Sequence, residues 1–184
     1  MIKVVNTVFN NYTNDSRVFK TANSLYEVGY EVSVIGHHDV NLPKIEIING
    51  VKIYRVSFLN RKITKSKLLK LIAHIKFIKE ALHYCTEANI IHCNDLNTLP
   101  IGILVKRYYN KNIKIVYDAH EYETQKNGLH RIQKKLIRLL EAYFIKHVDT
   151  IITVSDSIAD EYSKLYGINK PYVVLNVPAK KKME

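Results

Sequence analysis

Hydrophobic residues occur along the chain in short runs that alternate with longer stretches of helical spacing. The short runs are rich in Val and Ile, as in strands that are buried on both faces of a sheet. The longer stretches place apolar residues three or four positions apart, as in helices that pack one face against a sheet. The predicted strands are Ile2–Phe9, Glu31–Ile35, Ile45–Ile48, Val51–Val56, Asn89–Cys93, Lys114–Tyr117, Thr150–Val154 and Tyr172–Leu175.

The alternation of strands with helices predicts the class of fold. It calls for parallel strands joined by right-handed crossovers. Asn49-Gly50 lies between two of the strands and predicts a tight hairpin turn, so one pair is antiparallel. We expect an α/β protein, a Rossmann-like three-layer sandwich with a mostly parallel sheet of about seven strands. The predicted helices are Asp15–Val28, Ser66–Glu87, Leu99–Tyr108, Leu129–His147 and Ser157–Tyr166.

Polar residues follow most of the predicted strands. In open sheets of this kind, ligands bind at the carboxyl ends of the strands. His, Asp, Asn and Ser side chains would therefore gather along one edge, although loops are polar in any protein. The segments that end on this edge are Asn10–Asp15, Gly36–Asp39, His92–Asp95, Asp118–Glu121, Ser155–Asp156 and Asn176.

His120 is the strongest single candidate for a catalytic role. It follows a predicted strand and stands between Asp118 and Glu121, whose carboxylates could set its tautomer and its pKa. A histidine that packs and hydrogen-bonds locally fits the same position. Position alone leaves both interpretations open.

The start of the first helix is a candidate anion site. It follows Asn14, Asp15 and Ser16, so free backbone N–H groups and the positive end of the helix dipole are available there. Arg17 adds a positive charge to the same turn. Ordinary N-capping by Asp15 or Ser16 is the simpler interpretation of these residues taken alone.

The glycines are isolated in the sequence, and this excludes several common motifs. No G-x-G-x-x-G follows the first strand and no G-x-x-x-x-G-K-[ST] occurs, which disfavours a dinucleotide-binding dehydrogenase and a P-loop NTPase. The nucleophile motif G-x-S-x-G is also absent. Neither His92–Asp95 nor His120–Glu123 has the spacing of a structural zinc site, so no metal is expected.

The net charge of +11 implies affinity for anionic partners, such as nucleic acid, phosphorylated sugars or an acidic membrane surface. Cys85 and Cys93 are too few for a disulfide framework and are expected to be buried thiols in a reducing compartment. Lys70 and Lys76 interrupt the apolar stretch Leu68–Ile78, so no membrane span is expected. We expect a cytoplasmic protein, with peripheral contact to the inner membrane as a further expectation.

The helix predicted at Ser66–Glu87 carries an apolar stripe and basic residues. Phe77 and Tyr84 are one heptad apart and are expected on the face opposite to the stripe, together with Lys70. Exposed aromatic rings among lysines suit a membrane interface with anionic lipids, and a solvated helix face is the other interpretation. The stripe that should pack on the sheet is Leu68, Leu71, Ile75, Ile78, Leu82 and Cys85, and a second basic face, most simply solvated, is Arg131, Lys134, Lys135 and Arg138.

Three stretches of the sequence occur together in an order that is typical of one enzyme family. The first is NDSRVFKTANSLYEVGYEVSVIG, and the second is IIHCNDLNTLPIGILVKR followed by IKIVYDAHEYE. The third is EAYFIKHVDTIITVSDSIADEYSKLYG, which ends in YVVLNVP. Together they resemble the N-terminal domain of GT-B fold glycosyltransferases of family 4, also called group 1.

The resemblance implies an enzyme that transfers a sugar, with retention at the anomeric carbon, from a nucleotide-diphosphate donor to a glycan or glycolipid acceptor. Cell-surface polysaccharide synthesis is the expected setting. This domain would hold the acceptor, while a C-terminal domain would bind most of the donor and no cofactor would be covalently bound. By position the resemblance implies a catalytic role for His120, donor contacts for Asn14, Asp15, Ser16 and Arg17, and acceptor contacts for Asn11, Tyr12, Asn94, Asp95, Glu121 and Ser155.

The resemblance also sets the expected domain limits. Residues 1–178 correspond to the N-terminal domain, and residues 179–184 form a basic tail that leads toward a C-terminal domain. Without that domain the chain is expected to be inactive in sugar transfer. Many family members carry a Gly-Gly pair after the first strand, where this chain has Asn10–Asn14.

The alternative to a glycosyltransferase domain is a noncatalytic Rossmann-like module that binds nucleic acid or another polyanion. No RNP-like motif or zinc finger supports nucleic acid as a partner.

Overall fold

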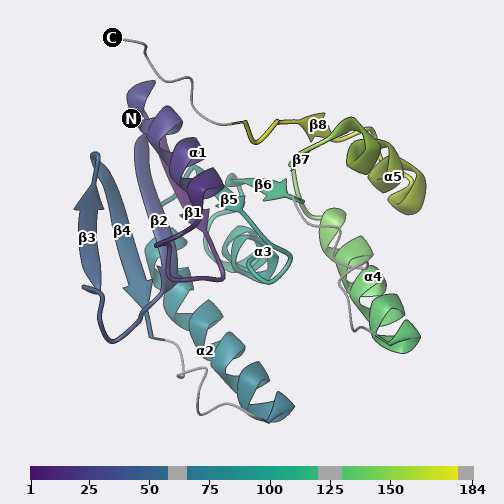
Figure 1. Ribbon diagram of the computed structural model, residues 1–184, viewed down its shortest axis with the longest axis horizontal. Coiled ribbons are helices and arrows are strands. Elements are labelled where there is room, and N and C mark those ends of the chain that lie inside the picture. Colours follow the sequence, from purple (N-terminus) through teal and green to yellow (C-terminus); the bar gives the residue numbers. More distant parts are fainter. Residues whose placement is uncertain (58–65, 120–129, 178–184) are drawn as a thin grey trace.

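The computed structural model of the chain describes residues 1–57, 66–119 and 130–177, which form one eight-stranded sheet with helices on both faces (Figure 1). The strand order is β3-β4-β2-β1-β5-β6-β7-β8, and every neighbouring pair is parallel except β3 with β4. The expected α/β fold is confirmed, with eight strands. The strands are β1 (Lys3–Thr7), β2 (Glu31–His37), β3 (Ile45–Ile48), β4 (Val51–Val56), β5 (Ile90–Cys93), β6 (Lys114–Asp118), β7 (Thr150–Thr153) and β8 (Tyr172–Val173); the helices are α1 (Ser16–Glu27), α2 (Lys67–Cys85), α3 (Leu99–Tyr108), α4 (Arg131–Ile145) and α5 (Asp156–Tyr166).

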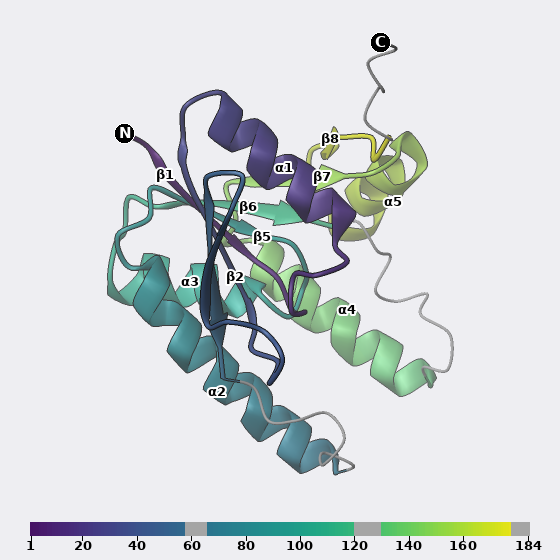
Figure 2. The ribbon, with the colours of Figure 1, turned by 60° about the vertical axis from the view of Figure 1, so that its left-hand side comes forward.

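The helices make the two outer layers of the sandwich (Figures 1 and 2). α1 packs on one face, where Val18 and Ala22 share a buried cluster with Val34 of β2 and Ile53 of β4. α2, α3 and α4 lie on the other face, and α5 packs beside β7 and β8. The larger of the two buried clusters lies on the side of α2, α3 and α4. On the opposite face of the sheet, α1 covers only a part.

β1 lies where the chain changes direction across the sheet. From β1 the chain passes to β2 and the β3–β4 hairpin on one side, and it then crosses through α2 to β5 on the other side of β1. At such a switch point the loops after the two adjacent strands diverge and leave a crevice at the carboxyl edge. Residues 8–15 after β1 and 94–98 after β5 lie at this position.

The β3–β4 hairpin is confirmed at the predicted residues. Asn49 and Gly50 form its turn, with φ angles of 51° and 82°. Both angles are in the left-handed region that a two-residue hairpin turn of this kind requires. Asparagine and glycine tolerate this region better than other residues, which is why the pair predicted the turn.

α2 corrects one expectation about packing. Leu68, Leu71 and Ile75 were expected to face the sheet, but they are 65%, 55% and 56% exposed. Two alanines in the row that does face the sheet let the helix lie close to it, and a phenylalanine between them fills the remaining space. The row that faces the sheet is spaced four residues apart and is fully buried: Ala73, Phe77, Ala81 and Cys85.

The expectation of an exposed Phe77–Tyr84 pair beside Lys70 is therefore wrong. The Phe77 ring is fully buried and lies 5.4 Å from the ring of Phe9 in the core. Tyr84 is 40% exposed and packs its ring at 4.5 Å from Tyr54 of β4. Among the described residues, none of the helices has the length and apolar character needed to cross a bilayer.

A buried carboxylate joins β6, α4 and α5. Glu141 of α4 is 1% exposed and accepts three hydrogen bonds from tyrosine hydroxyls. Tyr117 of β6 and Tyr162 of α5 donate to Oε1 at 2.7 Å and 2.6 Å, and Tyr166 donates to Oε2 at 2.6 Å. Burial, followed by the charge of Glu141, raises the pKa of Tyr117, so this hydroxyl remains a donor. These charge-assisted bonds fix the C-terminal third of the fold.

Gly36 of β2 has no room for a side chain, and we expect Gly36→Ala to destabilise the fold. A Cβ at this position would lie 2.7 Å from the carbonyl oxygen of Asn10, which also accepts the amide of His37 at 2.6 Å. Since both groups belong to the backbone, the loop after β1 would have to move. The expected loss of unfolding free energy in urea is about 1–3 kcal/mol. Ser33→Ala on the same strand is the control, and an equal effect of the two variants would contradict this account.

Candidate functional site

Three buried polar side chains follow one another across the sheet near its carboxyl edge. Asn6 of β1 is in register with His92 of β5, and Asp118 ends the adjacent strand β6. Their exposed fractions are 0%, 5% and 5%. Alternate residues of a strand point to the same face, and Val8, two residues after Asn6, belongs to the core beneath α1. The three polar side chains therefore lie on the α1 face of the sheet.

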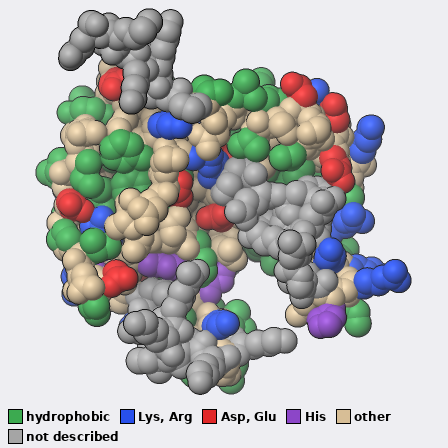
Figure 3. All heavy atoms as spheres, in the orientation of Figure 1, with side chains coloured by type: hydrophobic (Ala, Val, Ile, Leu, Met, Phe, Trp, Pro, Cys, Tyr) green, Lys and Arg blue, Asp and Glu red, His purple; other side chains and the backbone are tan. Residues whose placement is uncertain are grey.

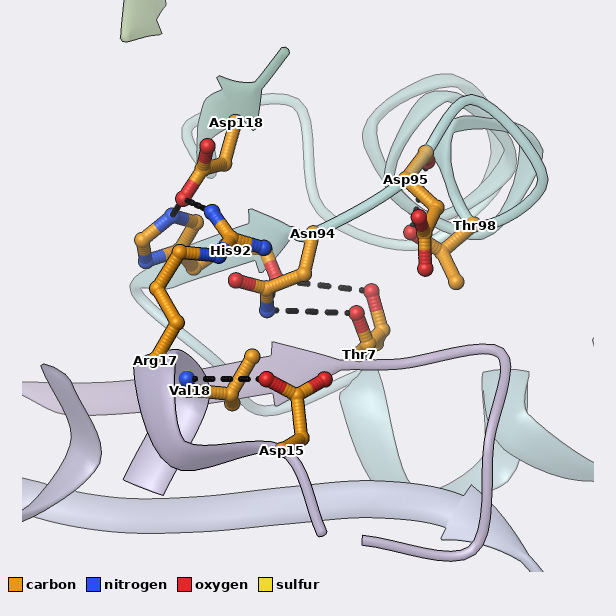
Figure 4. A network of polar contacts seen from close by, with 9 residues as sticks. All are labelled: Thr7, Asp15, Arg17, Val18, His92, Asn94, Asp95, Thr98 and Asp118. Atoms are coloured by element: carbon orange, nitrogen blue, oxygen red, sulfur yellow. Dashed lines mark hydrogen bonds and ion pairs between the residues drawn. The ribbon is translucent and has the colours of Figure 1, made fainter. Parts of the chain in front are cut away.

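Arg17 of α1 provides the charge that balances Asp118 (Figure 4). Its Nη1 donates to Asp118 Oδ2, and both side chains are largely buried, at 13% and 6% exposure. His92 Nε2 lies 3.7 Å from the same carboxylate oxygen. A helix and two strands thus bring a guanidinium, a carboxylate and an imidazole together. We call Asn6, Arg17, His92 and Asp118 the Arg17–Asp118 cluster.

The Arg17–Asp118 cluster has hydrogen-bonding capacity that the described residues leave unused. Both amide atoms of Asn6, Arg17 Nη2 and His92 Nε2 are buried and have no hydrogen-bond partner there. Buried polar atoms without a partner are rare in folded proteins, and each calls for an explanation such as a bound water, ion or ligand. The cluster can therefore donate and accept further hydrogen bonds.

The loop after β1 is held by hydrogen bonds to its backbone. Asn10 Oδ1 accepts from the amide of Tyr12 at 2.8 Å, and Tyr12 takes a left-handed φ of 57°. Arg55, which is 4% exposed, donates from Nε to the carbonyl of Asn11 at 3.1 Å. The loop adopts its left-handed position without a glycine because these contacts fix it.

The predicted ligand contacts in this loop differ in their exposure. Asn11 is half-buried, and Asn14 and Ser16 are exposed. Tyr12 is only 5% exposed, and its ring packs beneath α1 at 6.3 Å from Phe19. Burial raises the pKa of the Tyr12 hydroxyl to about 12. Tyr12 supports the loop from the core and does not present its ring at the surface.

The N-terminus of α1 is capped by the chain itself. Asp15 Oδ1 accepts the amide of Val18 at 3.2 Å, and Asn10 Nδ2 donates to Asp15 Oδ2 at 2.8 Å. Arg17 turns inward to Asp118. Asp15 is therefore an N-cap residue, and its carboxylate occupies the positive end of the helix dipole.

Asn94 and Asp95 connect β1 to β5 at the switch point. Asn94 is 1% exposed, and its Nδ2 donates to the carbonyls of Thr7 and His92, both at 3.3 Å. Asp95 is half-buried, and its Oδ2 accepts the amide of Phe9 at 3.5 Å. Of the two predicted acceptor contacts, Asp95 is the more accessible side chain.

The predicted acceptor contact Ser155 lies farther along the same edge. Ser155 follows β7 and caps α5 by accepting the amide of Ile158 at 3.4 Å. The predictions for His120 and Glu121 fall outside the described residues. His120 is the second residue after Asp118, so the chain enters that segment from the Arg17–Asp118 cluster.

The sequence patterns placed His92 and Asp118 at the carboxyl edge but assigned neither of them a ligand contact, and they gave Asn6 no role. Asn6 stands between Val4 and Val8 at alternate positions of a buried strand, where an apolar residue is usual. His92 is in register with Asn6 on β5, and Asp118 lies two residues beyond the position in register with His92 on β6. A polar residue at an inward position of a buried strand was the signal that could have found them.

The chemistry of the site is that of fixed charges and hydrogen bonds. Arg17 and Asp118 hold each other in place, so the cluster offers oriented donors and acceptors. Within residues 1–57, 66–119 and 130–177, no three His, Cys, Asp or Glu side chains are grouped to bind a metal ion. Such an arrangement suits the hydroxyls of a sugar or the oxygens of a phosphate.

The fold is similar to solved structures of larger proteins. Sucrose-phosphate synthase from Thermosynechococcus elongatus matches with a TM-score of 0.72 and 14% identity, over 95% of this chain and 48% of that one. The catalytic domain of starch synthase IV from Arabidopsis thaliana, bound to ADP and acarbose, matches with a TM-score of 0.68 and 12% identity, over 96% and 51%. Anabaena HepE in complex with UDP-glucose matches with a TM-score of 0.63 and 12% identity, over 96% and 44%. The chain thus spans about half the length of these structures.

At these identities the structural similarity shows the fold alone, and the sequence itself identifies the family. The comparison with curated proteins found no match. The sequence model of Glycosyltransferase Family 4 matches residues 16–176. This range begins at the first residue of α1, contains Arg17, His92 and Asp118, and ends after β8. Because the match covers most of the sequence, the chain belongs to glycosyltransferase family 4.

Proposed function

We propose that this chain is the N-terminal, acceptor-side half of a retaining glycosyltransferase. The enzyme would move a sugar from a nucleotide-diphosphate donor to a glycan or glycolipid acceptor. The Arg17–Asp118 cluster carries the proposal, because its unused hydrogen-bonding atoms lie next to the switch point of the sheet. Ligands of open α/β sheets bind at this position.

A nucleotide sugar as the donor is supported by the solved structures. HepE is in complex with UDP-glucose, and starch synthase IV is bound to ADP and acarbose. The chain spans about half of each, which supports a second domain as its partner. In the proposal that C-terminal domain binds most of the donor, no cofactor is covalently attached, and the present chain alone is inactive.

The Arg17–Asp118 cluster would act by position and charge. Asp118 fixes the guanidinium of Arg17, so the unused Nη2 is the atom available to an oxygen of the donor phosphates or of the sugar. Asn14, Asp15 and Ser16 begin the same helix and complete the donor side of the site. The acceptor contacts would be Asn11, Asp95, Glu121 and Ser155, while the buried Tyr12 and Asn94 hold the loop and the strand ends that carry them.

His120 is the proposed catalytic residue. Asp118 is the last residue of β6, and His120 follows it by two residues in the sequence. This connection to the cluster supports the proposal that His120 acts near the reacting sugar. Retention of the anomeric configuration would follow from holding donor and acceptor on the same face of the sugar. Most of the rate enhancement would then come from position and from stabilisation of an oxocarbenium-like state beside the departing diphosphate.

The proposal places the enzyme in the cytoplasm and at the inner face of a membrane, in the synthesis of a cell-surface polysaccharide. Cys85 and Cys93 are both free and buried, as expected in a reducing compartment. Burial raises the pKa of Cys93 to about 12, so this thiol is protonated at neutral pH. A glycolipid acceptor would be met at the membrane surface.

Nuclear magnetic resonance of the 15N-labelled chain tests this proposal. The probes are UDP-glucose, glycolipids extracted from the cells that express the protein, and a single-stranded DNA oligonucleotide. We expect the glycolipids to shift the amide signals of residues 10–17 and 92–95, and UDP-glucose to shift them only weakly. Glycolipids without effect, together with oligonucleotide binding that falls steeply with salt, would favour the polyanion-binding module instead.

A further inference from the structure

Large aliphatic side chains are exposed mainly on two helices. Thirteen leucine and isoleucine residues are exposed in the described part of the chain, and nine of them belong to α2 or α4. Isolated exposed hydrophobic residues are common on protein surfaces, but a concentration of this kind marks a contact surface. The nine residues, which we call the α2/α4 apolar surface, are Leu68, Leu69, Leu71, Ile72, Ile75, Ile132, Leu136, Leu139 and Leu140.

The exposed residues lie on the parts of both helices that extend away from the sheet. α2 follows β4 and α4 follows β6, so both helices begin on the side of the carboxyl edge. In Figures 1 and 2 their N-terminal halves project in the same direction, past the end of the sheet. On α4, Ile132, Leu136 and Leu140 are spaced four residues apart and form one continuous stripe, with exposures of 75%, 61% and 48%.

Among the described residues, the charges beside this surface are almost all positive. Arg131, Lys135 and Arg138 are exposed on α4, whose one acidic residue, Glu141, is buried. Lys70 and Lys79 are exposed on α2, and the first acidic residue of that helix, Glu80, comes after its apolar half. Figure 3 shows Lys and Arg side chains gathered along α4.

We propose that the α2/α4 apolar surface docks this chain onto a membrane that contains anionic lipids. Leucine and isoleucine side chains would enter the boundary between headgroups and acyl chains, and the flanking lysines and arginines would contact lipid phosphates. Helices with an aliphatic face and a basic border bind membranes in this way. The partner is assigned by charge complementarity, because the exposed charges along the apolar half of both helices are positive.

Docking through this surface deepens the proposed function by naming its partner. Both helices start at the carboxyl edge, so their contact with a membrane brings the Arg17–Asp118 cluster toward the lipid surface. A lipid-linked acceptor could then enter the site from the membrane. The proposal of lipid binding is argued from the side chains of α2 and α4 alone. The delivery of a lipid-linked acceptor to the site rests on the proposed function.

Co-sedimentation with vesicles tests the proposal directly. The 184-residue chain would be mixed with phosphatidylcholine vesicles that do or do not contain phosphatidylglycerol. We expect the chain to sediment with the phosphatidylglycerol vesicles at low salt and to remain in solution with pure phosphatidylcholine. Raising the salt concentration should release part of the bound protein, because only the electrostatic contribution is screened.

Two pairs of substitutions separate the apolar contribution from the charge. Leu136→Ser with Leu140→Ser is expected to weaken the partition coefficient by about tenfold or more. Its control, Ile45→Ser with Ile47→Ser on β3, removes equally exposed side chains elsewhere and should leave partitioning unchanged. Lys135→Glu with Arg138→Glu is expected to weaken binding by more than about twentyfold, since each basic residue contributes about fivefold. Its control, Lys111→Glu with Lys164→Glu, changes the net charge equally and should have a much smaller effect.

Three results would overturn the proposal. The first is a wild-type chain that stays in solution with phosphatidylglycerol vesicles. The second is equal binding by the Leu136/Leu140 variant and its control. The third is a dimer that the Leu136/Leu140 variant dissociates and that does not bind vesicles, which would assign the surface to a second copy of the chain. When joined to a C-terminal donor-binding domain, a variant that no longer binds vesicles but still transfers sugar to a soluble acceptor would leave the proposed function intact, so the two can fail separately.

Discussion

Replacing Glu141 with alanine is expected to lower the unfolding free energy of the chain by about 3–5 kcal/mol. The substitution removes one buried carboxylate and leaves the hydroxyls of Tyr117, Tyr162 and Tyr166 without their acceptor. Each buried hydroxyl that loses its partner costs about 1–3 kcal/mol, and part of that cost is recovered as the cavity relaxes. Since domains of this size are stable by about 5–15 kcal/mol, the loss is large.

Urea denaturation followed by circular dichroism measures this loss. Glu161→Ala is the matched control, because Glu161 is an exposed glutamate on the neighbouring helix α5. It is expected to change the free energy of unfolding by less than about 0.5 kcal/mol. If Glu141→Ala had no larger effect than Glu161→Ala, the three tyrosines would not depend on this carboxylate.

Breaking the pair between Arg17 and Asp118 is the second prediction with a large effect. Arg17→Ala removes the cation that contacts the buried Asp118 carboxylate, and Asp118→Ala removes the anion that contacts the guanidinium. Each single change is expected to destabilise the fold by about 3–5 kcal/mol, because removing one partner of a buried ion pair is costly. The double variant is expected to lose less than the sum of the two, with a coupling energy of about 2 kcal/mol.

A double-mutant cycle by urea denaturation gives this coupling energy. The control pair is Lys3 and Glu87, which are 2.9 Å apart at the surface, with side-chain exposures of 40% and 83%. Solvent screens such a pair, so its coupling should be far smaller than that of Arg17 with Asp118. Additive effects at Arg17 and Asp118 would mean that the two side chains do not stabilise each other.

The local elements of the fold could be predicted from the sequence because each is encoded within a few residues. Strands β3 and β4 and helix α3 begin and end at the predicted residues. Asn49 and Gly50 specify their turn through the backbone conformation that they tolerate. The parallel sheet follows from the alternation of elements, since a strand–helix–strand unit has one favoured handedness.

The packing of α2 could not be predicted from its own pattern. The helix extends beyond the sheet, so the apolar residues of its first half have no core to face. A stripe that includes Leu68, Leu71 and Ile75 has the right spacing for burial, but spacing does not indicate where the sheet ends. The alanines that determine the packing, Ala73 and Ala81, are weakly apolar and do not stand out in the sequence.

The Arg17–Asp118 cluster could not be predicted because its contacts are not local. Arg17 and Asp118 are 101 positions apart in the chain and meet only when the first turn of α1 comes to lie beside the carboxyl end of β6. In the sequence Arg17 is the charged residue of a helix start, and Asp118 is the polar residue that ends a strand. The carboxyl edge could be predicted as the place of the site, since topology defines it, while the partners within it depend on tertiary structure.

The most direct test of the proposed function is sugar transfer by the chain joined to a C-terminal donor-binding domain, with the 184-residue chain alone as the comparison. The donors are UDP-glucose, ADP-glucose and other nucleotide sugars, and the acceptors are glycolipids from the cells that express the protein. We expect transfer with retained anomeric configuration by the joined protein, a loss of about a hundredfold or more in its His120→Ala variant, and none by the chain alone. Transfer by the chain alone, or no transfer by the joined protein with any donor, would contradict the proposed function.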